Sequence, residues 1–250
     1  MKKSKNGRRT KKSTASRLRP FWIPILLLLV AAAAGSYYGT SWKGFEVKRI
    51  SVQGDHVVPR GEIVASAAIE RHTNLWLQNT RTAAARVRLI PYIDDAWIRR
   101  GLPATVTIVV TERTPYAVVQ SGAQPAKLID AHLRVLEMNA SRRDLPHLAC
   151  AVLPQPHTGD FLKDDCVRAL ARDYETLVKQ HVEARSLVRD RLGDVTAQIP
   201  PGITIKLGDD SDLEAKGALV DPILSQTRSE GRRIRALDLR APKTPVVVFQ

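Results

Sequence analysis

The stretch IPYIDDAWIRRGLPATVTIVVTERTPYAVV, residues 90–119, decides how the chain folds. Val106, Ile108 and Val110 alternate with neighbours that are mostly threonine, and this period of two indicates a half-buried strand. A preceding strand is predicted by three apolar residues, Ile93, Ala96 and Ile98. Gly101-Leu102-Pro103 lies between the two strands and is typical of a turn. The stretch therefore predicts a β-hairpin.

The charged residues of this stretch, Asp94-Asp95 and Arg99-Arg100, look at first like an active site. Adjacent residues on a strand point to opposite faces, however, so two neighbouring carboxylates do not form a facing acid–base pair. We interpret Asp94-Asp95 as solvated residues that lead into the strand. Asp164-Asp165 and Asp209 to Asp212 are predicted to act locally in the same way, as early-turn and capping residues of helices.

The residues upstream complete a small domain. KRISVQG, residues 48–54, alternates like a strand. Pro59 suits the first turn of a helix whose buried stripe is Ile63, Ala67 and Ala68, and Asn79 suits the cap of a second helix that runs to about Leu89. The order strand, helix, helix, strand, strand predicts one α+β domain over residues 45–116.

Residues 117–250 are predicted to form a mainly β domain with packed helices. The strongest helix covers residues 161–180, where apolar residues recur at helical spacing: Val167, Leu170, Ala171, Tyr174, Leu177 and Val178. A further helix is expected at residues 213–224. Strands are expected at residues 117–122, 127–137, 195–199, 203–207, 234–239 and 246–249.

The N-terminus carries most of the net charge of +14. Residues 1–20 hold nine of the 39 basic residues and no acidic one, which leaves 30 basic against 25 acidic residues elsewhere. Residues 21–38 are then free of charge, and a helix of that length covers about 27 Å, enough to cross a bilayer. The pattern predicts a cytoplasmic tail (1–20), a membrane span (21–42) with Pro24 in its first turn, and an exported remainder. A cleaved signal peptide and a DNA-binding tail are the alternative readings.

The sequence contains no catalytic or metal-ligand motif, and its six histidines are scattered. The sequence therefore predicts no enzyme and no cofactor. Cys150 and Cys166 are the two cysteines of the chain. They either form a disulfide, as an oxidising compartment would permit, or remain two buried thiols.

The opening stretch also carries a family pattern. Together with VKRISVQGD, residues 47–55, it resembles the POTRA domain of the FtsQ/DivIB bacterial cell-division proteins, whose patterns read V-x-x-I-x-V-x-G-N and l-P-x-V-x-x-A-x-V-x-R-x-x-P-x-t-l-x-I-x-V-x-E-R-x-P-x-A. The positions that match the second pattern are Pro91, Ile93, Ala96, Ile98, Arg100, Pro103, Val106, Ile108, Val110, Glu112, Arg113, Pro115 and Ala117. Weaker matches extend to IRALDLR, residues 234–240. Leu133 departs from the pattern, because the family usually has glycine there.

The resemblance implies a divisome scaffold without catalysis of its own, a single-pass protein of the bacterial cytoplasmic membrane that acts at the division septum. It implies FtsB/DivIC-like and FtsL-like partners, bound by a strand added to the last strand of the sheet, and further partners through the POTRA domain and the span. No nucleic acid is implied. The partner-binding residues expected from it are Arg100, Ala241, Lys243, Thr244, Val246, Val247, Val248 and Phe249.

The last strand also suggests docking by itself, because a short apolar terminal strand is expected to leave an open sheet edge. Pro242 and Pro245 lack backbone donors, so they should limit the added ladder to residues after 245. A charge at Val247 or Phe249 is expected to abolish partner capture and leave the fold intact. The alternative function is an envelope protein that uses a POTRA domain in protein assembly or transport.

Overall fold

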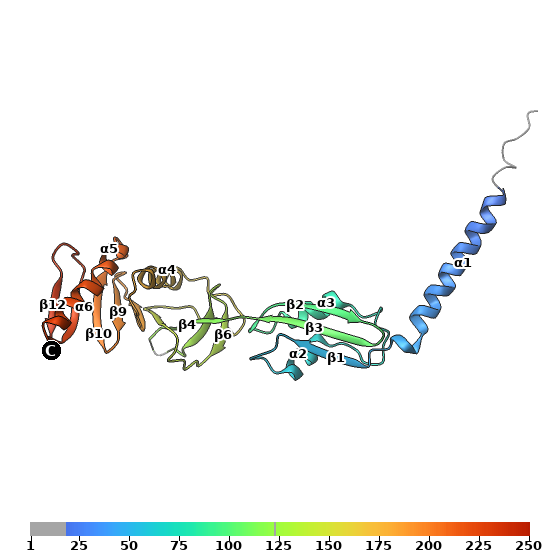
Figure 1. Cartoon of the computed structure of the whole chain (residues 1–250), viewed down its shortest axis with the longest axis horizontal. Helices are drawn as coiled ribbons and strands as arrows, with labels where there is room; N and C mark the ends of the chain where they lie inside the picture. The colour runs from blue at the N-terminus through green and yellow to red at the C-terminus, as the bar shows by residue number, and fades with distance from the viewer. Residues whose placement is uncertain (1–18, 123) are drawn as a thin grey trace, which may run out of the picture.

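The computed structural model describes residues 19–122 and 124–250, and their elements follow one another along an elongated molecule (Figure 1). A long helix lies at one end, a small three-stranded domain follows, and a larger domain built on a nine-stranded sheet lies at the other end. The predicted basic tail, except for Arg19 and Pro20, lies outside the described residues.

The first helix, α1, covers Arg19–Ser41. Its segment Trp22–Gly39 is long and apolar enough to cross a membrane, and none of that segment is buried against the protein. An apolar helix whose side chains all face outward is stable in lipid, where the backbone polar groups are satisfied within the helix. We had predicted Pro24 in the first turn of this helix, but the helix begins at Arg19 and Pro24 lies inside it. A short 3₁₀ helix, η2 (Lys43–Phe45), leads into the small domain.

The small domain has the predicted element order. It consists of β1 (Arg49–Gln53), α2 (Arg60–Ala67), α3 (Thr80–Val87), β2 (Ile93–Gly101) and β3 (Thr105–Glu112). The central strand β3 pairs parallel with β1 and antiparallel with β2. Both helices pack on the face of the sheet that carries Ile108 and Val110, because that face holds the alternating apolar residues.

Three local details of the small domain can be compared with the sequence. The Asn79 side chain accepts a hydrogen bond from the Thr82 N–H, so the predicted cap of α3 is confirmed. Ala68 was wrongly placed in the buried stripe, because it ends α2 in a left-handed conformation and is exposed. Helix α3 ends at Val87, and Leu89 is exposed beyond it.

The large domain holds strands β4 to β12 in one sheet, in the order β12-β11-β10-β9-β8-β7-β4-β5-β6. Their bounds are β4 Pro115–Gln120, β5 Lys127–Asp130, β6 Val135–Met138, β7 His147–Cys150, β8 Ser186–Arg189, β9 Val195–Ile199, β10 Ile203–Gly208, β11 Ile234–Asp238 and β12 Val246–Phe249. The helices are α4 (Asp165–Lys179), α5 (Leu213–Ala218) and α6 (Val220–Ser229). The fold class is therefore α+β, as predicted.

The sequence missed some elements of this domain. Strands β7 and β8 have four residues each, too few for a period of two to stand out. The single helix expected at 213–224 is divided into α5 and α6 at Leu219. Val178 was expected in the buried stripe of α4 but is 48% exposed.

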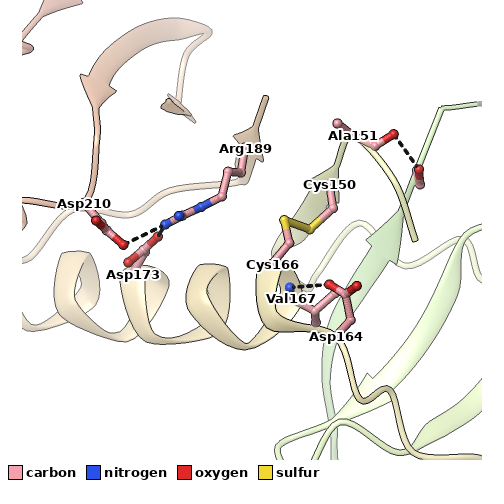
Figure 2. The surroundings of a disulfide bond; sticks show 9 residues. Cys150, Ala151, Asp164, Cys166, Val167, Asp173, Arg189 and Asp210 are labelled. Atoms are coloured by element: carbon pink, nitrogen blue, oxygen red, sulfur yellow. Dashed lines mark hydrogen bonds and ion pairs between the residues drawn. A yellow bond between two sulfur atoms is a disulfide. The ribbon is translucent and has the colours of Figure 1, made fainter. Parts of the chain in front are cut away.

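Helix α4 is held to the sheet at two places (Figure 2). Cys166 in its first turn forms a disulfide with Cys150 at the end of β7, with 6.2 Å between the two Cα atoms. Farther along, Arg189 of β8 donates to the Asp173 carboxylate at 2.7 Å and to Asp210 at 3.2 Å. Of the two states that the sequence left open for the cysteines, the structure has the disulfide.

The two domains meet around Arg113, which follows β3. Its guanidinium donates to the buried carboxylate of Asp130 at 2.6 Å and forms an ion pair with Asp94 at 2.8 Å, and the Arg113 side chain is only 9% exposed. Asp94 is thus an ion-pair partner at the joint between the domains, and the interpretation of this residue as merely solvated is wrong. Asp95 instead pairs with Arg88 at 2.7 Å.

Two further contacts join the domains. The Tyr92 hydroxyl donates to Glu137 of β6 at 3.0 Å, and the Arg134 guanidinium donates to the Arg88 carbonyl at 3.4 Å.

Leu133, where the family usually has glycine, adopts a φ of +63° in the β5–β6 turn. The Asp130 side chain supports that turn by accepting from the backbone N–H groups of His132 and Arg134.

The other paired aspartates act within their own loops, in part as predicted. Asp164 caps α4 by accepting from the Val167 N–H, and Asp165 pairs with Arg168. Asp212, however, makes no side-chain cap for α5. The Asp209 carboxylate instead binds the buried ammonium of Lys216 at 3.0 Å.

Candidate partner-binding edge

The nine-stranded sheet has two edges, and they differ. At β6 the neighbouring segment covers the backbone: the Val135 N–H donates to the Asp160 carbonyl, and the Gly159 N–H donates to the Val135 carbonyl, both at 2.8 Å. At the other edge, β12 pairs only with β11 within the part of the chain that the structure describes. An unpaired strand edge offers backbone donors and acceptors to another chain. The edge at β12 is therefore the candidate site.

The hydrogen bonds of the neighbouring strands show which backbone groups of β12 face outward. The Gln250 N–H donates to the Arg233 carbonyl, and Val248 lies opposite Ala236. Since the direction of backbone groups alternates along a strand, Val246 and Val248 bond toward β11, and Val247 and Phe249 present their N–H and C=O groups outward. Pro245 occupies the preceding outward position and has no N–H to offer.

The side chains of β12 alternate between the two faces of the sheet. Val246 and Val248 are 57% and 46% exposed. Val247 instead packs against the main core cluster, opposite the fully buried Leu237. We therefore now expect a charge at Val247 to lower the stability of the fold as well as partner binding, because the charge would lose part of its solvation against the core.

Phe249 ends the strand and is half-buried. The Arg232 guanidinium carbon lies 3.3 Å from the centroid of its ring. A cation over an aromatic face is attracted to it and also covers it from solvent. This contact fixes the end of β12 against the chain that enters β11.

The loop between β11 and β12 holds the other residues expected to bind a partner. Ala241, Lys243 and Thr244 are exposed, and the Thr244 N–H donates to the Ala241 carbonyl in a tight turn. Arg240 donates to Asp238 at 2.7 Å, and this hydrogen bond holds the pKa of Asp238 below its ordinary value. The charged pair fixes the loop just before β12 begins.

An open hollow of about 430 Å³ adjoins the end of β12. Its walls come from α6, the start of β11 and the β9–β10 turn, and they include Leu224, Arg228, Arg232, Arg233 and Gln250. The three arginines make this surface basic. A chain that pairs with β12 and continues past Phe249 would reach it, and acidic side chains would suit it.

Arg100, the remaining expected partner contact, lies in the small domain. Its guanidinium donates to the carbonyls of Leu75 at 3.0 Å and Gln78 at 2.8 Å, and it lies 5.9 Å from the Trp76 ring centroid. The structure therefore gives Arg100 a role in fixing a loop, and its role in partner binding stays a prediction.

One group of potential metal ligands occurs among the described residues, formed by Cys150, Asp164 and Cys166. Both sulfurs are joined in the disulfide, and the Asp164 carboxylate caps α4. These residues are therefore fully occupied in stabilising the fold, and a disulfide sulfur is not the thiolate that metal binding requires.

The small domain and the arrangement of the whole chain match known proteins. The family model described as "POTRA domain, FtsQ-type" matches residues 45–113. The chain is 25% identical to the Cell division protein FtsQ of Streptomyces venezuelae over 97% of this chain and 88% of that protein. It is 28% identical to the same-named protein of Streptomyces coelicolor, over 84% and 75% of the two chains, and 23% identical to that of Neisseria gonorrhoeae, over 88% and 86%.

The chain carries an FtsQ-type POTRA domain and is similar over most of its length to proteins named Cell division protein FtsQ. Its small domain is an FtsQ-type POTRA domain, and its apolar helix α1 fits a single-pass membrane protein. This similarity supports a role in the cell-division machinery and partners among division proteins. The names of these relatives describe cell-division proteins and no enzymatic activity.

Sequence reasoning missed the basic hollow beside β12 and the joint at Arg113. The arginines of the hollow are close in sequence. The β9–β10 turn, which forms another wall of the hollow, lies next to them only because β10 pairs parallel with β11. The signal that could have revealed the joint was Glu112-Arg113 in the matched pattern, a charged pair at the end of a half-buried strand.

Proposed function

We propose that this protein is a non-enzymatic divisome scaffold that captures FtsB/DivIC-like and FtsL-like partners outside the cytoplasmic membrane, and in this way helps control septal peptidoglycan synthesis. The partner adds a strand to β12. The observation that carries the proposal is the outward-facing backbone of Val247 and Phe249 on a strand paired on one side only.

The geometry supports a short register. Pro245 offers no donor at the outward position before Val247, so the ladder contains N–H donors of this chain at Val247 and Phe249. The exposed side chains of Val246 and Val248 lie beside the added strand and form cross-strand contacts with its residues. The arginines beside Phe249 favour a partner that is acidic in the segment adjoining its paired strand at the Phe249 end.

The proposed topology follows from the charges. The basic residues before α1 keep the N-terminus in the cytoplasm, so both folded domains lie outside it, in the compartment where a disulfide is stable. The POTRA domain and the span then serve recruitment to the division septum. The cell-division relatives favour this function over the alternative, a POTRA-bearing envelope protein for protein assembly or transport.

The decisive experiment compares two substitutions of one residue, Phe249→Pro and Phe249→Ala. Both remove the ring beneath Arg232, but only proline also removes the outward N–H. We expect Phe249→Ala to retain most of the binding to a purified FtsB-like partner and Phe249→Pro to lose substantially more. Equal binding by the two variants would contradict strand addition at β12.

A second comparison tests the exposed face of the strand and the cellular role. Val248→Lys should weaken binding while the fold remains intact, since Val248 is 46% exposed; Val188→Lys, at a 42% exposed valine of an inner strand, is the matched control. Fluorescent fusions of the wild-type protein should form a midcell band in dividing cells. A uniform envelope signal would count against the septal role.

A further inference from the structure

Exposed apolar side chains gather where the POTRA domain meets α1. Trp42, Trp76, Leu77 and Leu102, here called the basal cluster, are 60%, 53%, 65% and 66% exposed. Single exposed apolar residues are common on protein surfaces, but two tryptophans and two leucines at one end of a small domain are not. The strand addition proposed at β12, at the far end of the molecule, leaves this surface unexplained (Figure 1).

The loop that carries Trp76 and Leu77 is tied to the end of the membrane helix. The Asn74 amide donates to the Gly39 carbonyl of α1 at 3.2 Å, and the Leu75 N–H donates to the Phe45 carbonyl at 2.8 Å. The apolar segment of α1 ends at that same Gly39. The loop therefore lies at the level where the chain leaves the bilayer.

The tip of the β2–β3 hairpin is held beside this loop. The Arg100 guanidinium at the tip donates to the carbonyls of Leu75 and Gln78, which fixes Leu102 on the same end of the domain. Phe45 links the aromatic rings, with its centroid 4.9 Å from Trp42 and 6.4 Å from Trp76, both in edge-on contact. The basal cluster is thus a preformed surface rather than a set of loose side chains.

We propose that the basal cluster inserts into the headgroup region of the bilayer and seats the POTRA domain on the membrane. Tryptophan favours this region because its ring is apolar and its indole N–H can bond to headgroups. Arg100, stacked near Trp76, supplies a cation at the level of the phosphates, as does Lys43, which lines an apolar hollow of about 680 Å³ with Tyr37, Tyr38 and Trp42.

The occupant is lipid rather than protein for a geometric reason. The cluster follows directly on the residues that already occupy the bilayer, so the nearest surface that can cover it is the membrane itself. Seating fixes the direction in which the domains extend from the membrane, and with it the position of β12. A span from a partner protein is the rival occupant, and the test must distinguish the two.

The test uses the full-length protein alone in nanodiscs of phosphatidylethanolamine and phosphatidylglycerol. An environment-sensitive fluorophore is attached to Leu77→Cys or, as the matched control, to Val57→Cys. Val57 is 59% exposed in the same domain, but it lies beside Glu112 at the opposite end of the sheet. The two natural cysteines are joined in the disulfide, so they do not react with the label.

We expect the label at position 77 to emit at shorter wavelength and to lose intensity when lipids with a shallow doxyl quencher are included. The label at position 57 should show neither change. Equal emission and quenching at the two positions would overturn the proposal. A response at position 77 that requires co-reconstitution of a partner's membrane segment would also overturn it, because the cluster would then be a protein contact.

Discussion

Replacing Arg113 by methionine should destabilise the protein strongly, because it removes the cation between two carboxylates at the joint of the domains. The Asp130 side chain is only 4% exposed and accepts a 2.6 Å hydrogen bond from Arg113. Removing one partner of a buried ion pair costs roughly 3–5 kcal/mol, since the other charge stays buried.

Two contacts in the structure place the expected cost at the lower end of this range. Asp130 keeps two backbone donors, the N–H groups of His132 and Arg134, so its charge is not left without hydrogen bonds. Asp94, the second partner of Arg113, is 50% exposed, and an ion pair of this kind contributes at most about 1 kcal/mol. We therefore expect a loss of about 3 kcal/mol for Arg113→Met and less than about 1 kcal/mol for Asp94→Asn.

The assay is urea unfolding of the detergent-solubilised protein with two probes. No tryptophan lies in the large domain: Trp22 is in α1, and Trp42, Trp76 and Trp97 lie at or in the small domain. Changes in tryptophan fluorescence during unfolding therefore follow the small domain, whereas far-ultraviolet circular dichroism follows both domains. The two transitions should coincide in the wild type. In Arg113→Met they should separate and the midpoint should fall.

The control is Arg99→Met, which removes an exposed arginine from β2 and should change neither the midpoint nor the coincidence of the probes. An Arg113→Met protein that unfolds like the Arg99→Met protein would refute the assignment of Arg113 as the element that couples the domains.

Two further predictions concern single contacts. Burial alone would raise the pKa of Glu112. The hydrogen bonds that its carboxylate accepts from the backbone N–H groups of Val58, Val57 and His56 outweigh this effect, so the pKa lies below its ordinary value. Its stabilisation is thus present above the unfolded-state pKa of about 4.3 and is lost as the pH falls through the folded-state value. Glu112→Gln should cost roughly 1–3 kcal/mol at neutral pH and flatten the acid loss of stability; an unchanged pH profile would contradict this. The disulfide closes a loop of sixteen positions, so the double variant Cys150→Ala/Cys166→Ala should lose roughly 3 kcal/mol of unfolding free energy. Reductant should destabilise the wild type by a similar amount and leave the double variant unchanged, and equal stability of the reduced and oxidised wild type would count against the contribution.

The sequence predicted the elements whose signals are local. The two-residue period at Val106 to Val110 is enough for β3, because a strand with one buried face needs that alternation. Asn79 indicated the start of α3, because its side chain accepts from a free backbone N–H group. The helix expected at residues 161–180 was also found, but it begins at Asp165, and Asp164 is its cap rather than a residue of its first turn. The uncharged run from residue 21 to 38 predicted α1, because the length of a helix over these residues matches the thickness of a bilayer.

The sequence could not predict features that depend on residues brought together by the fold. Nothing in the residues around Asp94 reveals that its partner Arg113 also binds Asp130 of another domain. The faces of β12 were equally hidden, because VVVF has no alternation between apolar and polar residues. Only the pairing with β11 decides that Val247 points to the core and Val248 to solvent.

The sequence by itself thus determined the order of the chain: a basic tail, an apolar helix long enough to cross a bilayer, an α+β POTRA domain and a β-rich domain that ends in an apolar strand. These features rest on periodicity, charge and capping, which act over a few residues. Tertiary structure alone decided which sheet edge stays open, which backbone groups of β12 face outward, and that Arg113 joins the two domains. Those outcomes depend on strand pairing and on contacts between residues far apart in the chain, for which a local pattern carries no signal.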